Sequence, residues 1–357
     1  MSAIKVLGIE SSCDECSAAV VLHDAGSMAV LGQSTYSQTG IHEPYGGVVP
    51  EIASRNHLET INHMIAGALS RANLRPEEVD VLAVTNRPGL VGALLVGVSA
   101  AKAMAYALGK PLVPVHHLEG HIAGVFLENK TAAAAPYPML IAVISGGHTN
   151  TYVSHGPPEL WPLDFLRKSL VGRSRDDAAG EAFDKSGKTL GLAYPAGRLI
   201  DAMAREGNAG AFAFPRALPQ KDVLDFSFSG LKTAVALTAQ KLRESGTLQN
   251  HMLDLCASIQ EAIVDSLLAK IYLAARTRKC RSLAVVGGVA ANSRMRNRLM
   301  DEWSRQGFEI PPLFPAPEYC TDNAAMIAAA GGIRFLQGQG LSGRALLELG
   351  AMANPEV

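Results

Sequence analysis

Cysteine is scarce in this sequence, and the five that occur, at positions 13, 16, 256, 280 and 320, form an odd and scattered set. Such a set excludes a regular disulfide framework and favours a reducing compartment. The first residues run straight into an apolar stretch and lack the pattern of a signal peptide. No continuous apolar run reaches the roughly 18 residues that span a bilayer. We therefore expect a cytoplasmic protein without a membrane anchor.

Charged and aromatic residues are also few, at 18% and 6% of the chain. The formal net charge of −1 excludes a global basic field for nucleic acid, although local basic clusters can still bind it. The chain has instead 48% hydrophobic residues and 34 glycines, which favours α/β units with tight turns over a β-sandwich. Its 357 residues exceed one ordinary core and suit two domains.

Residues 115–124, VHHLEGHIAG, are the most informative stretch. A short apolar strand leads into them, and the pattern predicts a helix with His117 and His121 one turn apart on the same face. Two imidazoles so placed can bind one divalent metal ion and then need a third ligand. Asp322, just before a late helix of small residues, is the candidate. The alternatives are that the histidines are ordinary polar residues and that Thr321 or Asp322 only caps that helix.

Two strand–turn–strand patterns resemble each other. Residues 5–22 form an apolar hairpin around a polar turn at 11–15, and residues 29–36 can supply a third strand. Residues 139–153 repeat the pattern around the turn 145–150, SGGHTN. This similarity suggests an internal duplication. Each turn either faces a phosphate or metal–phosphate group or is a plain polar hairpin turn.

A glycine-rich turn also follows the strand predicted at 282–286. The diglycine 287–288 leads into a helix, an order typical of an anion or nucleotide site, because glycine allows close approach and the helix start offers free N–H groups. Basic clusters at 167–175, 276–281 and 294–298 either meet phosphates or are solvated helix ends.

Together these patterns predict the fold class: α/β, with two duplicated actin/Hsp70/hexokinase-like (ribonuclease H-like) domains and an interdomain cleft. The proline-containing stretch 131–138 is the best linker and separates an N-terminal domain, residues 1–130, from a C-terminal domain, residues 131–357. The last helix is able to pack back on the N-terminal domain. In this plan the hairpin turns hold phosphates, the late glycines hold adenosine, and the two histidines face Asp322 across the cleft.

Eight motifs, in chain order, resemble the bacterial TsaD family: GIESSCDE, YGGVVPEIASR, HHLEGHIAG, ISGGHT, DDAAGEAFDK, FSFSGLKT, GGVAAN and CTDNAAM. The resemblance covers nearly the whole chain. It implies a tRNA N6-adenosine threonylcarbamoyltransferase, an activity once labelled O-sialoglycoprotein endopeptidase. Such an enzyme transfers the threonylcarbamoyl group from threonylcarbamoyl-adenylate to N6 of the adenosine next to the anticodon in tRNAs that read ANN codons, and it releases AMP.

The resemblance also implies roles for single residues. One divalent metal ion, with Fe2+ expected and Zn2+ as the alternative, would be bound by His117, His121 and Asp322. The substrate-binding loop would comprise Ile144, Ser145, Gly146, Gly147 and His148. The adenylate or its nucleotide would be held by Asp184, Gly197, Asp201 and Asn292. No general base is assigned with this set; His148 is a candidate, and the alternative is that it only binds substrate.

The partners implied by the resemblance are tRNA, threonylcarbamoyl-adenylate, a TsaB-like paralogue that pairs through the first domain, and a TsaE-like ATPase. The small-residue helix 91–108 is a candidate contact for the paralogue, and packing inside the domain is the alternative.

Some positions depart from the family pattern. Asn86 and Arg87 stand where small residues with glycine are usual, which changes the turn before residue 88. The run Pro-Ala-Gly-Arg at 195–198 replaces Pro-Gly-Gly-Pro, so the role of Gly197 is less secure than that of Asp184.

Cys16 stands where threonine is usual, and with Cys13 it forms a CxxC. The pair flanks a hairpin turn, whereas reactive thiols usually lie at helix starts or beside cations, so a redox role is disfavoured.

Two other functions are compatible with parts of the pattern. The histidine pair also occurs in metallopeptidases, but Glu119 lies two residues after His117 rather than next to it, so the HExxH arrangement is missing. An ATPase or sugar kinase of the same fold would instead hydrolyse or transfer phosphate with magnesium.

Overall fold

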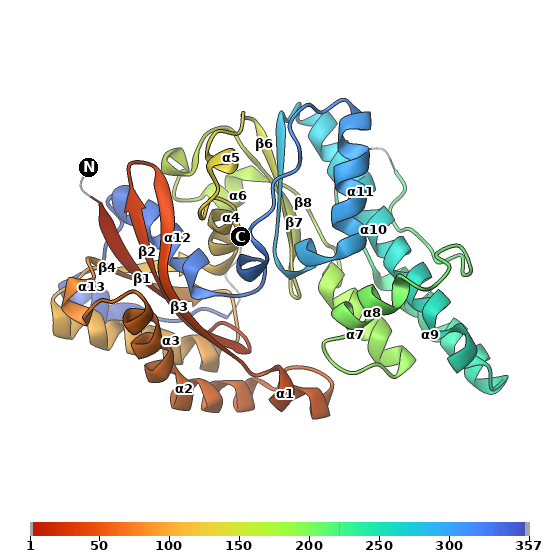
Figure 1. Ribbon diagram of the computed structural model, residues 1–357, viewed down its shortest axis with the longest axis horizontal. Coiled ribbons are helices and arrows are strands. Elements are labelled where there is room, and N and C mark those ends of the chain that lie inside the picture. The colour runs from red at the N-terminus through yellow and green to blue at the C-terminus, as the bar shows by residue number, and fades with distance from the viewer. Residues whose placement is uncertain (1–2, 221, 354–357) are drawn as a thin grey trace. The chain divides into compact units, whose positions relative to one another are not determined.

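The computed structural model describes residues 3–220 and 222–353, and its chain divides into two compact units (Figure 1). Unit 1 comprises the chain up to Ala134, the segment Pro157–Leu163 and the chain from Pro315 onward. Unit 2 comprises Ala135–Gly156 and Asp164–Phe314. The late segment that carries Asp322 therefore belongs to the same unit as the two histidines.

Unit 1 contains a five-stranded sheet in the order β3-β2-β1-β4-β5. Strand β1 pairs antiparallel with β2 and parallel with β4, β2 pairs antiparallel with β3, and β4 pairs parallel with β5. The predicted opening hairpin and its third strand are confirmed. The strand bounds are β1 Ile4–Glu10, β2 Glu15–Asp24, β3 Ser27–Ser37, β4 Val81–Arg87 and β5 Leu112–His116.

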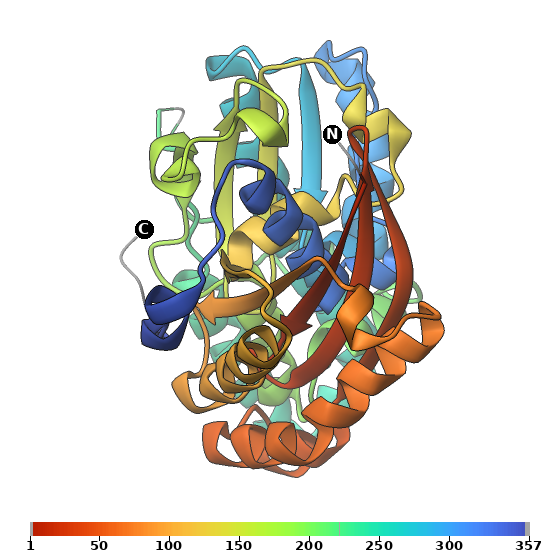
Figure 2. The same cartoon turned by 90° about the vertical axis from the view of Figure 1, so that its left-hand side faces the viewer.

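Helices cover both faces of this sheet. Leu7 and Ile9 of β1 pack in the core with residues of α2 and α3, whereas Gly8 between them faces α12. A Cβ added at Gly8 would lie 2.4 Å from the Ala324 carbonyl oxygen, so α12 rests directly on the strand backbone. Helices α2 and α12 accordingly lie on opposite sides of β1 (Figures 1 and 2). The helix bounds are α1 Thr39–His42, α2 Pro50–Arg71, α3 Val91–Leu108, α4 His117–Gly124, α5 Lys130–Ala133, α12 Ala324–Leu336 and α13 Gly343–Glu348.

Helix α3 corrects one expectation from the sequence. Its 18 residues have a mean hydropathy of 1.7, so by length and composition it is apolar enough to cross a membrane. In unit 1, however, α3 packs against β4 and α2, and its Leu94 and Ala101 are fully buried. A core helix passes the same compositional test, because both environments select apolar side chains.

Unit 2 contains a four-stranded sheet in the order β8-β7-β6-β9. Strand β6 pairs antiparallel with β7 and parallel with β9, which repeats the pairing of β1 with β2 and β4 in unit 1. The second predicted hairpin and the α/β class with two similar sheets are confirmed. The strand bounds are β6 Met139–Ile144, β7 Thr149–Ser154, β8 Leu170–Arg173 and β9 Ser282–Val286.

The helices of unit 2 pack on this sheet and on one another. Their core includes Phe183 of α7, Ile200 of α8, Val235 of α9, Ile263 of α10 and Leu299 of α11, all buried. Helix α7 begins at Ala179. The helix bounds are α6 Phe165–Ser169, α7 Ala179–Leu190, α8 Ala196–Ala204, α9 Ser229–Glu244, α10 Met252–Thr277 and α11 Ser293–Trp303.

Candidate metal centre and substrate-binding residues

The histidine helix forms as predicted at the end of edge strand β5. The Nδ1 atom of His116, the last residue of β5, accepts a hydrogen bond of 3.2 Å from the Leu118 N–H and caps α4. His117 and His121 follow, only 5% and 1% exposed, with ring centroids 4.7 Å apart in an edge-to-face arrangement. The two imidazoles therefore lie on one buried face of α4.

Asp322 completes this group. Its Oδ1 atom lies 3.5 Å from His117 Nε2 and 3.2 Å from His121 Nε2, and the three potential ligand atoms all lie within 4.8 Å of one another. The cap of α12 is neither Thr321 nor Asp322 but Asn323, whose Oδ1 accepts from the Met326 N–H at 3.0 Å. Since Asn323 satisfies the helix end, the Asp322 carboxylate is available to the histidines.

The chemistry of this group fits a divalent transition metal. Two imidazole nitrogens and one carboxylate oxygen are a donor set found at zinc and non-haem iron sites. Buried polar atoms normally find partners, yet neither ring nitrogen of His121 has a hydrogen-bond partner among the described residues. His117, His121 and Asp322 could therefore hold one metal ion, with coordination positions left for other ligands.

A buried carboxylate that the sequence analysis did not single out supports His117 from behind. Glu10 is fully buried at the end of β1, and its Oε2 lies 3.1 Å from His117 Nδ1. The same oxygen accepts from Thr85 Oγ1 at 2.6 Å, and Oε1 accepts from the Ser12 N–H at 2.5 Å. A carboxylate in this place keeps the proton on Nδ1 and presents the Nε2 lone pair to the metal. The sequence feature that could have revealed Glu10 is an acidic residue at the end of an otherwise apolar strand.

The charges of these groups depend on one another. Burial disfavours the charged form of His117, but the carboxylates of Asp322 and Glu10 outweigh it and hold the pKa of His117 well above its ordinary value. Burial likewise opposes ionisation of Asp322, and the two histidines nevertheless hold its pKa well below the ordinary value. The metal-free site therefore stores a proton on His117 between two carboxylates.

Metal affinity is consequently expected to rise with pH. The raised pKa of His117 stabilises the metal-free fold below the unfolded value of about 6.5, and this contribution is lost as pH rises through the folded pKa. A metal ion must displace that proton. Metal affinity should therefore increase roughly tenfold per pH unit at pH values below the folded pKa of His117. Chelator competition at several pH values measures the slope, and an affinity that does not change with pH would contradict the proton assignment.

The cysteines show no sign of redox chemistry. All five are free, and only Cys13 is not fully buried. Burial, with the acidic neighbour Asp14, raises the pKa of Cys13 well above its ordinary value, and burial raises the pKa of Cys16 to about 11. Both thiols stay protonated at neutral pH and are poor nucleophiles.

In unit 2, the predicted substrate loop lies at the tip of the β6–β7 hairpin. The Ser145 N–H donates to the His148 carbonyl at 2.8 Å, and the His148 N–H donates to Ser145 Oγ at 3.2 Å. The start of α7 supports the loop from one side: a Cβ at Gly180 would lie 2.6 Å from Gly146 Cα. A Cβ at Gly146 or Gly147 would meet no heavy atom within 4 Å, so the other side of the loop is open.

The diglycine after β9 lies beside this loop. Gly287 has a φ of +92°, and a Cβ there would lie 2.5 Å from the Ile144 carbonyl oxygen. Only glycine permits this approach without strain. A Cβ at Gly288 would meet open space. The ends of the parallel strands β6 and β9 thus place both glycine-rich turns at one edge of the sheet.

Asp184 and Gly197 are brought together at the start of α8. Asp184 Oδ1 accepts from the Ala196 N–H at 2.8 Å and from the Gly197 N–H at 3.3 Å. The departure at position 196 leaves the first of these bonds intact, because it uses the backbone. A Cβ at Gly197 would make only an ordinary contact of 3.7 Å with Phe183, so the backbone does not require glycine there.

Asp201 and Asn292 meet at the start of α11. Asp201 Oδ1 accepts from Ser293 Oγ at 2.8 Å. Asn292 caps α11 through its Oδ1, which accepts from the Met295 N–H at 3.0 Å, and its Nδ2 donates to Gln260 Oε1 at 2.7 Å. These predicted residues therefore support helix starts next to the diglycine turn.

The three basic clusters differ in their surroundings. Arg294 and Arg298 form ion pairs with Glu261, Asp265 and Glu302, so they are engaged inside unit 2. The cluster 276–281 precedes β9 and so lies at the opposite edge of the sheet from the glycine-rich turns. Arg173, which is exposed and pairs with Asn150 across β7 and β8, is at the same edge as the substrate loop.

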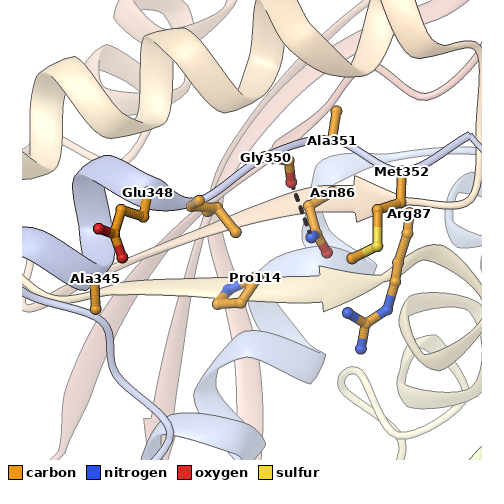
Figure 3. Close-up of a pocket in the computed structure, with 9 residues that line it drawn as sticks. Asn86, Arg87, Pro114, Ala345, Glu348, Gly350, Ala351 and Met352 are labelled. Atoms are coloured by element: carbon orange, nitrogen blue, oxygen red, sulfur yellow. Dashed lines mark hydrogen bonds between the residues drawn. The ribbon is translucent and has the colours of Figure 1, made fainter.

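The departure at Arg87 leaves the neighbouring turn in contact with Ser12, whose hydroxyl lies 3.2 Å from His117 Nδ1. The Leu90 N–H donates to the Ser12 carbonyl at 2.8 Å, and a Cβ at Gly89 would lie 2.5 Å from that oxygen. Arg87 is one of the residues that line a pocket of 430 Å³, where Asn86 Nδ2 donates to the Gly350 carbonyl (Figure 3). The larger residue is therefore accommodated at the surface of unit 1.

Comparisons with known proteins extend these observations. The model of the family described as TsaD, tRNA N6-adenosine threonylcarbamoyltransferase, matches residues 29–329. A protein of that name from Anaeromyxobacter sp. (strain Fw109-5) is 50% identical over 338 residues, which cover 94% of this chain and 96% of the relative. Another of that name, from Moorella thermoacetica, is 47% identical over 332 residues, covering 93% and 92%.

Two solved structures support the fold alone. Component A of the (R)-2-hydroxyglutaryl-CoA dehydratase of Acidaminococcus fermentans is 15% identical, with a TM-score of 0.51 over 94% of this chain and 99% of that one. HypF of T. kodakarensis is 14% identical, with a TM-score of 0.58 over 94% of this chain and 48% of that one.

Proposed function

This chain belongs to the TsaD family of tRNA N6-adenosine threonylcarbamoyltransferases, and we infer that it performs the reaction which names that family. The observation that carries this conclusion is 50% identity over 96% of the length of a relative with this name. We propose further that the donor is threonylcarbamoyl-adenylate, that the acceptor is N6 of the adenosine next to the anticodon in tRNAs that read ANN codons, and that AMP leaves. In this proposal the reaction takes place in the cytoplasm.

Unit 1 supplies the metal site in this proposal. His117, His121 and Asp322 would hold one divalent ion, Fe2+ by expectation and Zn2+ as the alternative. When bound, such an ion acts as a Lewis acid toward an oxygen atom. Glu10 keeps the proton of His117 on Nδ1 and so orients the ring, with Ser12 and Thr85 holding the carboxylate in place.

Unit 2 supplies the adenylate site in this proposal. Gly146 and Gly147 have open space where a Cβ would lie, and their N–H groups would suit developing negative charge. Asp184 and Asp201 would accept hydrogen bonds from ribose hydroxyls; a carboxylate has about four acceptor positions, more than the helix starts use. His148 either accepts a proton or only binds substrate. Arg173, at the same sheet edge, is a candidate contact for tRNA phosphates.

The partner proteins would be a TsaB-like paralogue and a TsaE-like ATPase. An exposed apolar stripe on α3 supports a docking surface for the paralogue, because Val91, Leu95 and Tyr106 share one helix face and are 51%, 47% and 69% exposed. Leu58 of the neighbouring α2 is 65% exposed. Large exposed apolar side chains grouped in this way mark interaction sites.

Replacement of Leu95 with aspartate is expected to weaken binding of the paralogue about thirtyfold or more, the effect of losing one interface hot spot. Co-purification and titration of the two purified proteins measure it. Leu160→Asp, at an apolar residue that is 74% exposed and lies outside α2 and α3, is the control. Equal binding of both variants would place the contact elsewhere.

The function is tested by incubating the protein with labelled threonine, bicarbonate, ATP, tRNA and its partner proteins. Label in tRNA that depends on this chain supports transfer to adenosine. Cleavage of a peptide would favour the metallopeptidase, and a phosphorylated sugar would favour the kinase; either result without labelled tRNA would overturn the proposal.

A further inference from the structure

A buried ion pair lies on the side of α4 away from the metal site. Glu119 is two residues from each of His117 and His121, so the helical turn of about 100° per residue points it to the opposite face. Its carboxylate receives two hydrogen bonds from Arg334 of α12, Nε to Oε2 at 3.0 Å and Nη2 to Oε1 at 2.5 Å. Both residues are buried, at 8% and 6% exposure.

The Nη1 group of Arg334 is also engaged. Its Nη1 donates to the Pro162 carbonyl at 3.1 Å and to Gln337 Oε1 at 3.0 Å. The side chain of Gln337 in turn donates to the Trp161 carbonyl at 3.0 Å. The arginine is therefore held in one orientation from several sides, and a two-point contact between guanidinium and carboxylate has little rotational freedom.

Two glycines of α4 also lie at its contact with α12. A Cβ at Gly120 would lie 2.6 Å from Ile327 Cδ1, and one at Gly124 would lie 3.5 Å from Met326 Cβ. Glycine lets the two helices approach closely, but it provides no side chain that interlocks and prevents α4 from turning about its own axis. The ion pair is the directional contact on this side of the helix.

Small rotations of α4 matter for a metal site. A turn of about 20° moves an atom ~7 Å from the helix axis by about 2 Å, whereas metal–ligand distances tolerate only about 0.2 Å. Helix α12 carries Arg334, and Asp322 lies two residues before its start, so one element orients α4 and supplies the third ligand.

We propose that Glu119 and Arg334 are positioning residues whose ion pair sets the rotation of α4 and thereby makes His117 and His121 converge with Asp322 on one metal ion. The inference rests on the proposed metal site and adds residues that do not touch the ion. The pair also removes Glu119 from the role of a peptidase base, because both carboxylate oxygens are bound to Arg334.

The test separates positioning from stability with a double variant. Glu119→Gln or Arg334→Met leaves one buried partner without its counter-charge and is expected to lower the melting temperature. Glu119→Leu combined with Arg334→Met replaces the pair by apolar side chains, which often restores stability. We expect this double variant to melt near the wild type but to bind Zn2+ at least ~10-fold more weakly.

Zn2+ affinity is measured by chelator competition on metal-free protein, and the ligand-field spectrum of the Co2+ form reports the coordination geometry. Arg298→Met, which breaks a partly buried ion-pair cluster in unit 2, is the control that lowers stability without changing Zn2+ affinity. Arg334→Lys, which keeps the charge but not the two-point contact, is expected to lose affinity to an intermediate degree and keeps the test decisive if the double variant does not fold.

The outcomes are distinct. A double variant, or Arg334→Lys if the double variant is unfolded, with wild-type Zn2+ affinity and an unchanged Co2+ spectrum overturns the positioning role alone. Wild-type protein that binds no Zn2+, or a His121→Ala variant that binds it normally, overturns the metal site and this inference with it.

Discussion

Replacement of His121 with alanine is expected to remove metal binding and to reduce threonylcarbamoyl transfer about a thousandfold or more. Lewis-acid stabilisation is worth several kcal/mol, and each 1.4 kcal/mol or so corresponds to a factor of ten in rate. The fold should survive, because His121 Nδ1 makes no hydrogen bond among the described residues and the helix is held by its other contacts. Metal analysis, labelled-tRNA formation and calorimetry measure the three quantities.

The matched control is His63→Ala, an exposed histidine on α2. It should keep both the metal and the activity. Full transfer activity in a metal-depleted His121→Ala protein would show that the reaction does not need this site. Loss of activity together with loss of the fold would instead assign His121 to the core of unit 1.

Replacement of Glu10 with alanine is expected to weaken metal binding by 10-fold to 100-fold, the usual effect of losing the carboxylate behind a ligating histidine. The reason is that His117 Nδ1 loses the acceptor at 3.1 Å that fixes its proton and ring orientation. The lost counter-charge should also lower the pKa of His117, so the rise of metal affinity with pH should level off at a lower pH.

Two further substitutions sharpen this prediction. Glu10→Gln keeps the shape and an acceptor oxygen but not the charge, so its loss of affinity should be smaller than that of Glu10→Ala. Thr85→Val removes only the 2.6 Å hydrogen bond to Glu10 and should have the smallest effect of the three. The same affinity in Glu10→Ala and wild type would show that His117 is oriented by other contacts.

Local patterns accounted for much of the architecture. The histidines at 117 and 121 lie on a helix with a period of 3.6 residues, so their common face follows from spacing alone. The hairpins at both sheets follow from alternating apolar runs around polar turns. The glycines at 146, 147 and 287 lie where the chain turns, and at Gly287 the φ of +92° and the nearby Ile144 carbonyl require glycine.

Other features needed the assembled chain. The sequence cannot show that Asn323 rather than Asp322 caps α12, because both residue types cap helices equally well. It also cannot separate Arg294 and Arg298, which are engaged by acidic residues of α10 and α11, from Arg173, which stays exposed. The acidic residues of α10 lie far from these arginines in the chain, so no local sequence pattern shows that they are paired.

What the sequence by itself determined is the local part of this enzyme: two similar α/β hairpins, glycine-rich turns and an imidazole pair one helical turn apart. Only the tertiary structure decided what completes the metal site, since Glu10, His117 and Asp322 come from three separate parts of unit 1. The physical reason is the distance along the chain over which each kind of interaction acts. Helical and strand periods act over a few residues, whereas a buried carboxylate finds its imidazole through packing of elements that lie far apart in the chain.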